Sequence, residues 1–395
     1  MKPRAGTPKL KLPIDPAHYR RTDRSPIGRW VWEIDRVLLL LLTVLITVGL
    51  IAVAAASPAA ALRYSDGSAR LSDLYFFYRQ LMWIAVSMPV MILISMMSRD
   101  RARRFSMGGA LIFFLLLAAV PFVGAERNGA VRWIEFGIGQ FQPSEFLKPF
   151  FVVTLAWLLS IQNKEKGLPI FWVSGWLFGI VAVLLMKQPD FGSTIIFGTV
   201  WVAMLTFAGI NVRILGLLGL VAVVGVILAY FFYPVATIRI DGFLFGEGDN
   251  YQVEKAMQTL TAGGLFGVGP GGGTQKYSLP EPQNDYIFSV IGEEFGLIAC
   301  AIVACLYLAI VVRVLVKLLD EEDVFALLAA SGLAIQFGLQ ALINMAVNVQ
   351  LVPSKGMTLP FISYGGSSML ALSIGMGLLL AFTRRNPYLG ARRLA

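Results

Sequence analysis

Histidine and cysteine, two residue types that often perform acid–base or nucleophilic chemistry, are scarce in this chain. Its single histidine, His18, lies in a polar N-terminal tail, and its two cysteines, Cys300 and Cys305, lie in one apolar run. A disulfide scaffold and a Cys/His zinc site are therefore excluded, and both cysteines are expected to be small buried hydrophobic residues. Proton transfer by this chain must come from carboxylates, lysines or tyrosines.

Polar and acidic residues gather where four apolar helices are predicted to start. Proline in the first turn and Ser, Asp or Asn at the cap are typical helix-start signals. If the four starts share one face, their free N–H groups and positive dipole ends form an anion site that suits phosphate. Helix capping alone explains each start taken singly. The residues are Gln142, Ser144 and Glu145; Gln188 and Asp190; Asn284 and Asp285; and Ser367 and Ser368.

Basic residues near these starts strengthen the predicted anion site. Arg132, Lys148 and Lys276 would add full positive charges, and such a site favours a diphosphate ligand. Glu145 lies three residues before Lys148, so the two side chains are expected to pair on one helix face.

Further polar residues fall inside apolar helices, where charges and amides are costly. Glu293 and Glu294 lie about two turns into one helix, and a structural ion pair explains them as well as a ligand contact does. Amides recur every fourth residue on another helix, and we favour hydrogen bonds to neighbouring helices over the lining of a cavity. This stripe is Gln336, Gln340, Asn344 and Asn348.

The composition identifies the elements that position these residues. Of the 395 residues, 57% are hydrophobic and 14% are charged, against roughly 25% charged in a soluble domain. The fold class is therefore an all-α polytopic membrane protein. Runs suited to spans of about 20 residues predict about ten transmembrane helices, at 36–56, 79–97, 107–124, 143–160, 169–186, 190–208, 214–233, 286–312, 324–347 and 366–383.

The distribution of basic residues orients the bundle. Most of the 33 Lys and Arg residues fall in the segments that share a side with the N-terminus, and such segments are normally cytoplasmic. Both termini are therefore predicted to be cytoplasmic. The net charge of +9 is mainly a topology signal, so we expect no nucleic-acid partner.

Three regions follow from these spans. Residues 1–35 are predicted to be a disordered basic cytoplasmic tail, residues 36–385 the ten-helix membrane domain, and residues 386–395 a cytoplasmic C-terminal tail. A large periplasmic loop at 234–285, between the seventh and eighth helices, is too long for a simple connector. Its glycine-rich stretch, 263–273, is expected to be flexible and has no βαβ context for dinucleotide binding.

Six ordered motifs from about residue 36 to 387 resemble the SEDS family (shape, elongation, division and sporulation). The sequence Gln188–Gly192 and the long polar tail favour the division branch of that family over the elongation branch. Gln283 and Asn284 stand where relatives often have His-Thr. The motifs are Arg132–Ile134, Gln142–Lys148, Gln188–Gly192, Tyr251–Gly264, Leu279–Glu294 and Leu359–Ser368.

The resemblance implies a peptidoglycan glycosyltransferase that polymerises lipid II in the bacterial cytoplasmic (inner) membrane, at the division septum. It implies Mg²⁺ or Mn²⁺ as cofactor, with unknown ligands. It also implies a class B penicillin-binding protein as transpeptidase partner, together with other division proteins. Asp285 matches the essential acidic residue of the family's large outer loop. Arg132, Glu145 and Lys148 match its other charged motif residues, and Glu281 belongs to the same loop motif as Asp285.

For the reaction we expect Asp285 to act as general base. It would take the proton from a hydroxyl of lipid II, and that hydroxyl would attack the undecaprenyl diphosphate-linked glycan. Arg132, Lys148, helix N-termini and the divalent cation would stabilise the diphosphate that leaves. Two alternatives remain open from the sequence. One is a transporter that flips lipid II, and the other is a non-catalytic scaffold for division.

Overall fold

The computed structural model describes residues 25–65, 71–127, 130–136, 139–162, 169–245, 251–353 and 356–384. Every predicted apolar run forms a helix, which confirms the all-α polytopic class. Nine helices of the described ranges are long and apolar enough to cross a membrane, whereas α7 has 17 residues. The helices are α2 (Arg36–Arg63), α3 (Tyr75–Ser95), α4 (Arg99–Val123), α5 (Pro143–Ile161), α6 (Ile170–Lys187), α7 (Phe191–Phe207), α8 (Val212–Phe232), α11 (Ile287–Leu318), α12 (Val324–Asn348) and α13 (Gly366–Thr383).

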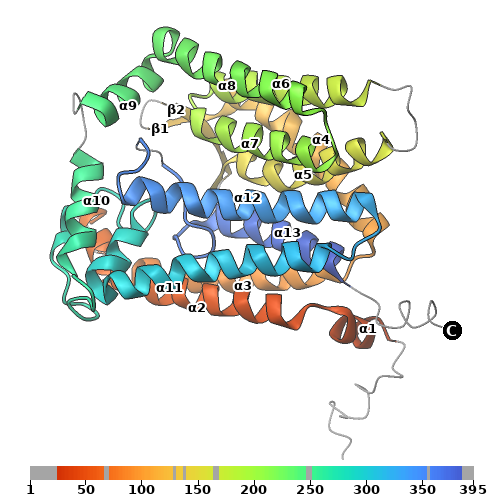
Figure 1. Ribbon diagram of the computed structural model, residues 1–395. Coiled ribbons are helices and arrows are strands. Elements are labelled where there is room, and N and C mark those ends of the chain that lie inside the picture. The colour runs from red at the N-terminus through yellow and green to blue at the C-terminus, as the bar shows by residue number, and fades with distance from the viewer. Residues whose placement is uncertain are drawn as a thin grey trace, which may run out of the picture.

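The helices form a bundle with two distinct ends (Figure 1). The short helix α1 (Pro26–Glu33) lies at one end, where α13 also ends. The other end carries the short strands between α4 and α5 and the two helices between α8 and α11. We call it the outer end, because the sequence predicts that it faces outward.

The centre of the bundle is built from α5, α12 and α13. In these three helices 67%, 67% and 72% of the most apolar window is buried, against 6% in α8. The span with the most polar start, α5, is thus among the most buried. Its charged residues are tolerated because they face other helices and not lipid.

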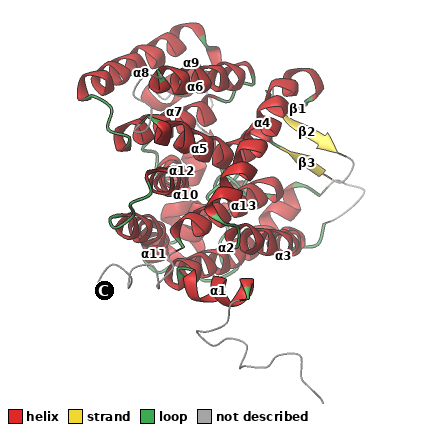
Figure 2. Ribbon diagram, turned by 90° about the vertical axis from the view of Figure 1, so that its right-hand side faces the viewer, coloured by secondary structure: helices red, strands yellow, loops and turns green. Residues whose placement is uncertain are grey.

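A small antiparallel sheet precedes α5 and was not predicted from the sequence. Strands β1 (Ala125–Arg127), β2 (Ala130–Phe136) and β3 (Gly139–Phe141) pair in the order β1-β2-β3. Figure 2 shows the sheet on the side of the bundle beside α4. It carries Arg132 at the outer end and leads the chain into α5.

The predicted large loop is mostly helical. It contains α9 (Pro234–Phe245), α10 (Tyr251–Ala262) and a short 3₁₀ helix, η2 (Gln275–Ser278). Helix α10 packs against α11 and η2. Helix α10 and η2 therefore cover part of the outer end, whereas α9 packs against α8.

The expectation that residues 263–273 are flexible is wrong, because this stretch fills a break in α11. At Gly296 the backbone has φ 84° and ψ 173° and leaves the helix. The N–H groups of Leu297 and Ile298, which the break frees, donate to the carbonyls of Gly264 and Leu265 at 3.0 and 3.3 Å. Two carbonyls before the break are satisfied in the same way, since those of Glu293 and Glu294 accept from Val268 and Gly269. The stretch thus completes the hydrogen bonding of the broken helix.

The end of the predicted disordered tail is ordered. Residues 26–33 form α1, whose Trp30 indole donates to the Ser95 hydroxyl at 2.8 Å. Asp35 caps α2 and accepts from Arg313 and Lys317 at 3.1 Å each. Residues 1–24 and the predicted C-terminal tail, 386–395, lie outside the described residues.

The packed glycine stretch yields a first prediction. A Cβ added at Gly263 would overlap the carbonyl oxygens of Gly292 and Glu293. Gly263→Ala should therefore lower the free energy of unfolding by about 1–3 kcal/mol, the usual cost of overpacking. Thermal unfolding in detergent would measure it. Gly216→Ala on α8 is the control, because a Cβ there meets nothing within 4 Å. Equal melting temperatures for the two variants would contradict the packing.

Candidate functional site

Asp285 lies at the outer end, two residues before the first residue of α11. Its backbone carbonyl accepts hydrogen bonds from the side-chain amides of Asn344 and Asn348, at 3.0 and 3.1 Å. The residue as a whole is half-buried, and no described residue donates a hydrogen bond to its carboxylate. Carboxylate oxygen Oδ2 lies 2.9 Å from where a Cβ on Gly356 would stand. The absence of that side chain makes room for the carboxylate.

The environment of Asp285 favours its protonated form. Burial among protein atoms, and to a smaller extent the negative charge of Glu281, together raise the pKa of its carboxyl to about 7. A carboxyl with a pKa near 7 exists in both protonation states at neutral pH. It is therefore suited to taking up a proton during a reaction and releasing it afterwards.

Glu281, the neighbouring carboxylate, is held by hydrogen bonds. It accepts from the Tyr64 hydroxyl at 2.6 Å and from the Gln283 amide at 3.1 Å. Burial raises the pKa of the Glu281 carboxyl, and the hydrogen bond from Tyr64 opposes this rise. Of the two carboxylates, only that of Asp285 is without such a donor.

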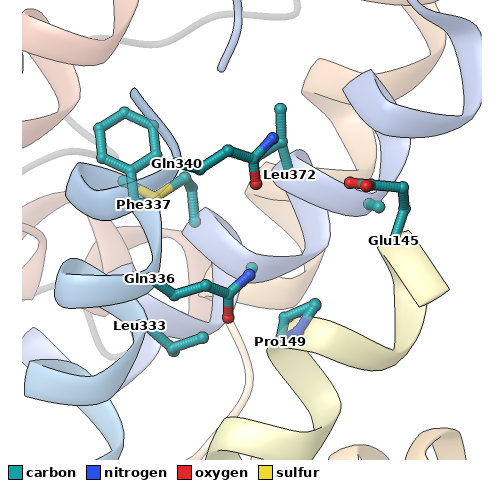
Figure 3. Close-up of a pocket in the computed structure, with 10 residues that line it drawn as sticks. Glu145, Pro149, Leu333, Gln336, Phe337, Gln340 and Leu372 are labelled. Atoms are coloured by element: carbon teal, nitrogen blue, oxygen red, sulfur yellow. The ribbon is translucent and has the colours of Figure 1, made fainter. Parts of the chain in front are cut away.

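Glu145 and Lys148 form the predicted ion pair. Lys148 Nζ lies 2.6 Å from Glu145 Oε1, and the lysine side chain is 2% exposed. Glu145 also lines a narrow cavity between α5, α12 and α13, wide enough for water. Figure 3 shows its carboxylate facing the cavity from α5, opposite the amides of Gln336 and Gln340. Lys148 thus neutralises Glu145 and leaves one of its oxygens for this cavity.

The amide stripe of α12 serves two purposes. Gln336 and Gln340 line the cavity, and neither Oε1 atom has a hydrogen-bond partner among the described residues. Gln340, Asn344 and Asn348 donate to backbone carbonyls of the outer end that lie between helices, so the favoured packing interpretation and the cavity interpretation each hold for part of the stripe. Gln336 and Asn344 are eight residues apart, which is about 12 Å along a helix. The stripe therefore leads from the cavity to Asp285.

Arg132 lies in a network around the turn before α7. It donates to the Gln188 carbonyl at 2.9 Å and, in a very short contact, to the Pro189 carbonyl. Asp190 caps α7 through Ser193 N–H and accepts from the Gln142 amide at 3.2 Å. The structure thus brings four predicted residues together: Arg132, Gln142, Gln188 and Asp190.

Sequence reasoning missed Arg239 of α9. Its guanidinium lies within electrostatic reach of Arg132, Asp190 and Tyr286. Burial lowers the pKa of Arg239, and the positive charge of Arg132 lowers it further. No described residue forms a hydrogen bond or ion pair with it. The signal that could have found it was a lone arginine in the first helix of the large loop.

Lys276 is not near the other predicted anion-binding residues. Its side chain is 1% exposed, contacts Glu294 closely and donates to the Ala55 carbonyl at 2.9 Å. Glu293 accepts from the backbone N–H groups of Gln275 and Lys276, at 2.6 and 2.9 Å. This geometry favours the structural explanation for Lys276, Glu293 and Glu294.

The predicted serines lie in the first turns of α5 and α13. Ser144 is buried, and its hydroxyl has no hydrogen-bond partner among the described residues. The Ser368 hydroxyl donates to the Gly365 carbonyl at 3.2 Å, and Ser367 stands beside it in the first turn of α13. Their predicted contact with substrate stays a prediction.

Comparison with known proteins supports the family resemblance seen in the sequence, over most of the chain. The family model for FtsW/RodA/SpoVE, described as cell cycle proteins, matches residues 35–388. The chain is 39% identical to a probable peptidoglycan glycosyltransferase FtsW from Caulobacter vibrioides, over 93% of this chain and 94% of the relative. A relative of the same name from Aromatoleum aromaticum is 34% identical, over 88% of this chain and 87% of its own.

Solved structures share the fold. A chain of a peptidoglycan synthase complex, described as coordinating polymerization and crosslinking, has a TM-score of 0.71 and 26% identity, over 89% of this chain and 97% of that chain. The rod shape determining protein RodA of Thermus thermophilus has a TM-score of 0.65 and 26% identity, over 89% and 96% respectively.

The environment of Asp285 predicts a pH-dependent stability difference. A carboxyl whose pKa is raised on folding destabilises the folded state once pH rises above its ordinary pKa, and the penalty is complete above about pH 7. Asp285→Asn removes this penalty because an amide does not ionise. The variant should melt at a higher temperature than the parent at pH 8, and the difference should shrink steadily toward pH 5. A difference that is the same at both pH values would contradict the raised pKa.

The pair of Lys276 and Glu294 yields a third prediction. Lys276→Met leaves a buried carboxylate without its partner and should cost about 3–5 kcal/mol of stability. Adding Glu294→Gln should recover most of that loss, because the amide oxygen can still accept from the Gly271 N–H that now donates to Glu294. If Lys276 is structural, the double variant also keeps its activity. A stable but inactive double variant would instead support contact with substrate.

Proposed function

The chain belongs to the FtsW/RodA/SpoVE family of cell cycle proteins, and we propose that it polymerises peptidoglycan glycan strands from lipid II at the outer end of its bundle. It is a multi-pass membrane protein and a peptidoglycan glycosyltransferase, the activity for which its curated relatives are named. The substrate, the residues that act on it and the cellular site of action are the subject of the proposal.

The observation that carries the proposal is the Asp285 carboxylate. Asp285 is half-buried at the outer end, and its carboxylate receives no hydrogen bond from the described residues and has a pKa near 7. As general base it takes the proton from the 4-hydroxyl of the lipid II GlcNAc. That oxygen attacks C1 of the MurNAc that ends the growing strand, and the bond from C1 to the diphosphate oxygen breaks. The anomeric centre inverts in this single displacement.

The leaving group is undecaprenyl diphosphate, which departs as an anion and needs no general acid. Arg132 and Arg239 supply positive charge near Tyr286, the residue after Asp285. Positive charge placed where the diphosphate oxygens develop negative charge lowers the barrier. Lys148 is paired with Glu145 and 2% exposed in this structure, so we assign the charge stabilisation to the two arginines first.

A divalent cation, Mg²⁺ or Mn²⁺, remains part of the proposal. The described ranges contain no group of three or more His, Cys, Asp or Glu side chains that would hold a metal. Mg²⁺ often binds through one or two carboxylates and substrate phosphates. The ion would therefore be held largely by the diphosphate, and its ligands within the chain are not assigned.

The partner is proposed on the same basis. A chain with this fold belongs to a solved peptidoglycan synthase complex that coordinates polymerization and crosslinking. We propose that a class B penicillin-binding protein supplies transpeptidation here, with other division proteins, at the septum. The match to relatives named FtsW supports the division site.

A polymerisation assay tests the role of Asp285. Purified lipid II would be supplied in liposomes to the parent chain and to Asp285→Ala, each co-purified with its class B partner carrying an inactivated transpeptidase serine. Loss of a general base costs about 10²–10⁴-fold, so the variant should make no detectable glycan polymer. Chelation of Mg²⁺ and Mn²⁺ should also stop the parent enzyme.

Assembly and transport provide the controls. Asp285→Ala should still reach the membrane and co-purify with its partner, because no described side chain bonds its carboxylate. Polymer formed by this variant at the parent rate would overturn the assignment of the base. Absence of polymer from both proteins, together with lipid II translocation in the same liposomes, would favour a transporter.

A further inference from the structure

The backbone that carries Asp285 is held by residues distant in sequence. The carbonyl of Gln283 accepts from the Tyr364 N–H at 2.8 Å, and that of Asn284 accepts from the Ser363 hydroxyl at 2.7 Å. The carbonyl of Asp285 accepts from two amides of α12. Successive carbonyls are thus fixed by the segment after α12 and by α12 itself.

Asn344 occupies the centre of this arrangement. Its Nδ2 donates to the Asp285 carbonyl at 3.0 Å and also to the Met357 carbonyl. Met357 follows Gly356, against which the Asp285 carboxylate rests. One amide group therefore joins the backbone of Asp285 to the wall that its carboxylate touches.

Asn348 supports the same contact from one turn further along α12. Its Nδ2 donates to the Asp285 carbonyl, and its Oδ1 accepts from the N–H and hydroxyl of Ser289, at 3.2 and 2.7 Å. Asn344 and Asn348 are 1% and 0% exposed. Both belong to a largely buried helix, so their amides are held rigidly by packing.

We propose that Asn344 is a positioning residue for the reaction, supported by Asn348 and Ser363, and that it sets where the Asp285 carboxylate stands; this inference rests on the proposed role of Asp285 as base. The carboxylate has no side-chain donor among the described residues, so its place is decided by its backbone and by Gly356. A displacement of about 1 Å at a reacting group can cost about 100-fold in rate. Anchoring the backbone is therefore a direct means of controlling the rate.

The same contacts hold Asp285 in its partly buried position. Glu281 is the one charged group of the described residues that acts on its carboxyl, whereas α12 and residues 356–358 present amides and backbone. Burial is the main cause of the raised pKa of Asp285. If the anchor is lost, water enters and the pKa falls toward its ordinary value. The pH at which activity is half-maximal should fall with it.

The test compares variants of the full chain in complex with the class B partner, with lipid II as substrate. Asn344→Leu conserves size but removes both donated hydrogen bonds. We expect kcat to fall about 10- to 100-fold, KM to stay within about twofold, and the acid-side midpoint of the pH profile to move to lower pH. Ser331→Ala is the control, because this buried hydroxyl on α12 bonds only to its own helix, at Leu328. It should leave kcat, KM and the midpoint unchanged.

Ser363→Ala provides a second route to the same answer. It removes the hydroxyl that donates to the Asn284 carbonyl and accepts from the Leu359 N–H, and it should lower kcat and shift the midpoint in the same direction, by less. This variant decides the matter if Asn344→Leu does not fold. A folded Asn344→Leu with parental kcat would overturn the inference, and so would a lower kcat with an unmoved midpoint, which is the sign of a merely structural role. Neither result would affect the base assignment, which fails only if Asp285→Ala retains activity.

Discussion

Backbone groups that leave regular helix inside this bundle have little water to bind, so each must find a partner in the protein. This constraint explains the outer end. The break at Gly296 exposes two N–H groups and two carbonyls, and the glycine-rich stretch satisfies all four. The irregular segment from Gln283 to Asp285 is satisfied in the same way by Ser363, Tyr364 and the amides of α12. The partners that prevent unpaired backbone groups also fix the candidate base.

Charge follows the same constraint. Several charged side chains inside the bundle are paired with one another: Lys276 with Glu294, Lys148 with Glu145, and Asp35 with Arg313 and Lys317. Arg132 donates hydrogen bonds to two backbone carbonyls. Asp285 and Arg239 differ, since neither side chain has a hydrogen bond or ion pair with the described residues. Opposite charges of this kind, left unpaired at one end of a bundle, are suited to binding a sugar hydroxyl and a diphosphate.

The central helices combine rigidity with polarity. Helix α12 is largely buried and carries four amides on one face. Two of these amides line a cavity with Glu145, and two hold Asp285. A single helix therefore links the interior of the bundle to the outer end. Because α12 packs against α5, α11 and α13, movement of the cavity walls would reach the candidate base through one rigid element.

The sequence by itself determined the class of fold, the positions of the apolar helices and the presence of Asp285 at a helix start. Hydropathy decides these features locally, since an apolar run of sufficient length must be a helix in a bilayer. It also predicted the pair of Glu145 and Lys148, because residues three apart on a helix are neighbours.

Only the tertiary structure decided how the other polar residues are used. Glu293 and Glu294 had two equally good explanations and Lys276 was predicted to bind an anion, but contacts between η2 and α11 favour a structural role for all three. The glycine-rich stretch was expected to be flexible, and its packing depends on carbonyls about thirty residues away in sequence, beyond what local pattern can predict. The position of Arg239 near Arg132 and the hydrogen bond from Asn344 to the Asp285 carbonyl likewise depend on contacts between distant segments. Such contacts follow from how helices pack and not from the order of residues within any one of them.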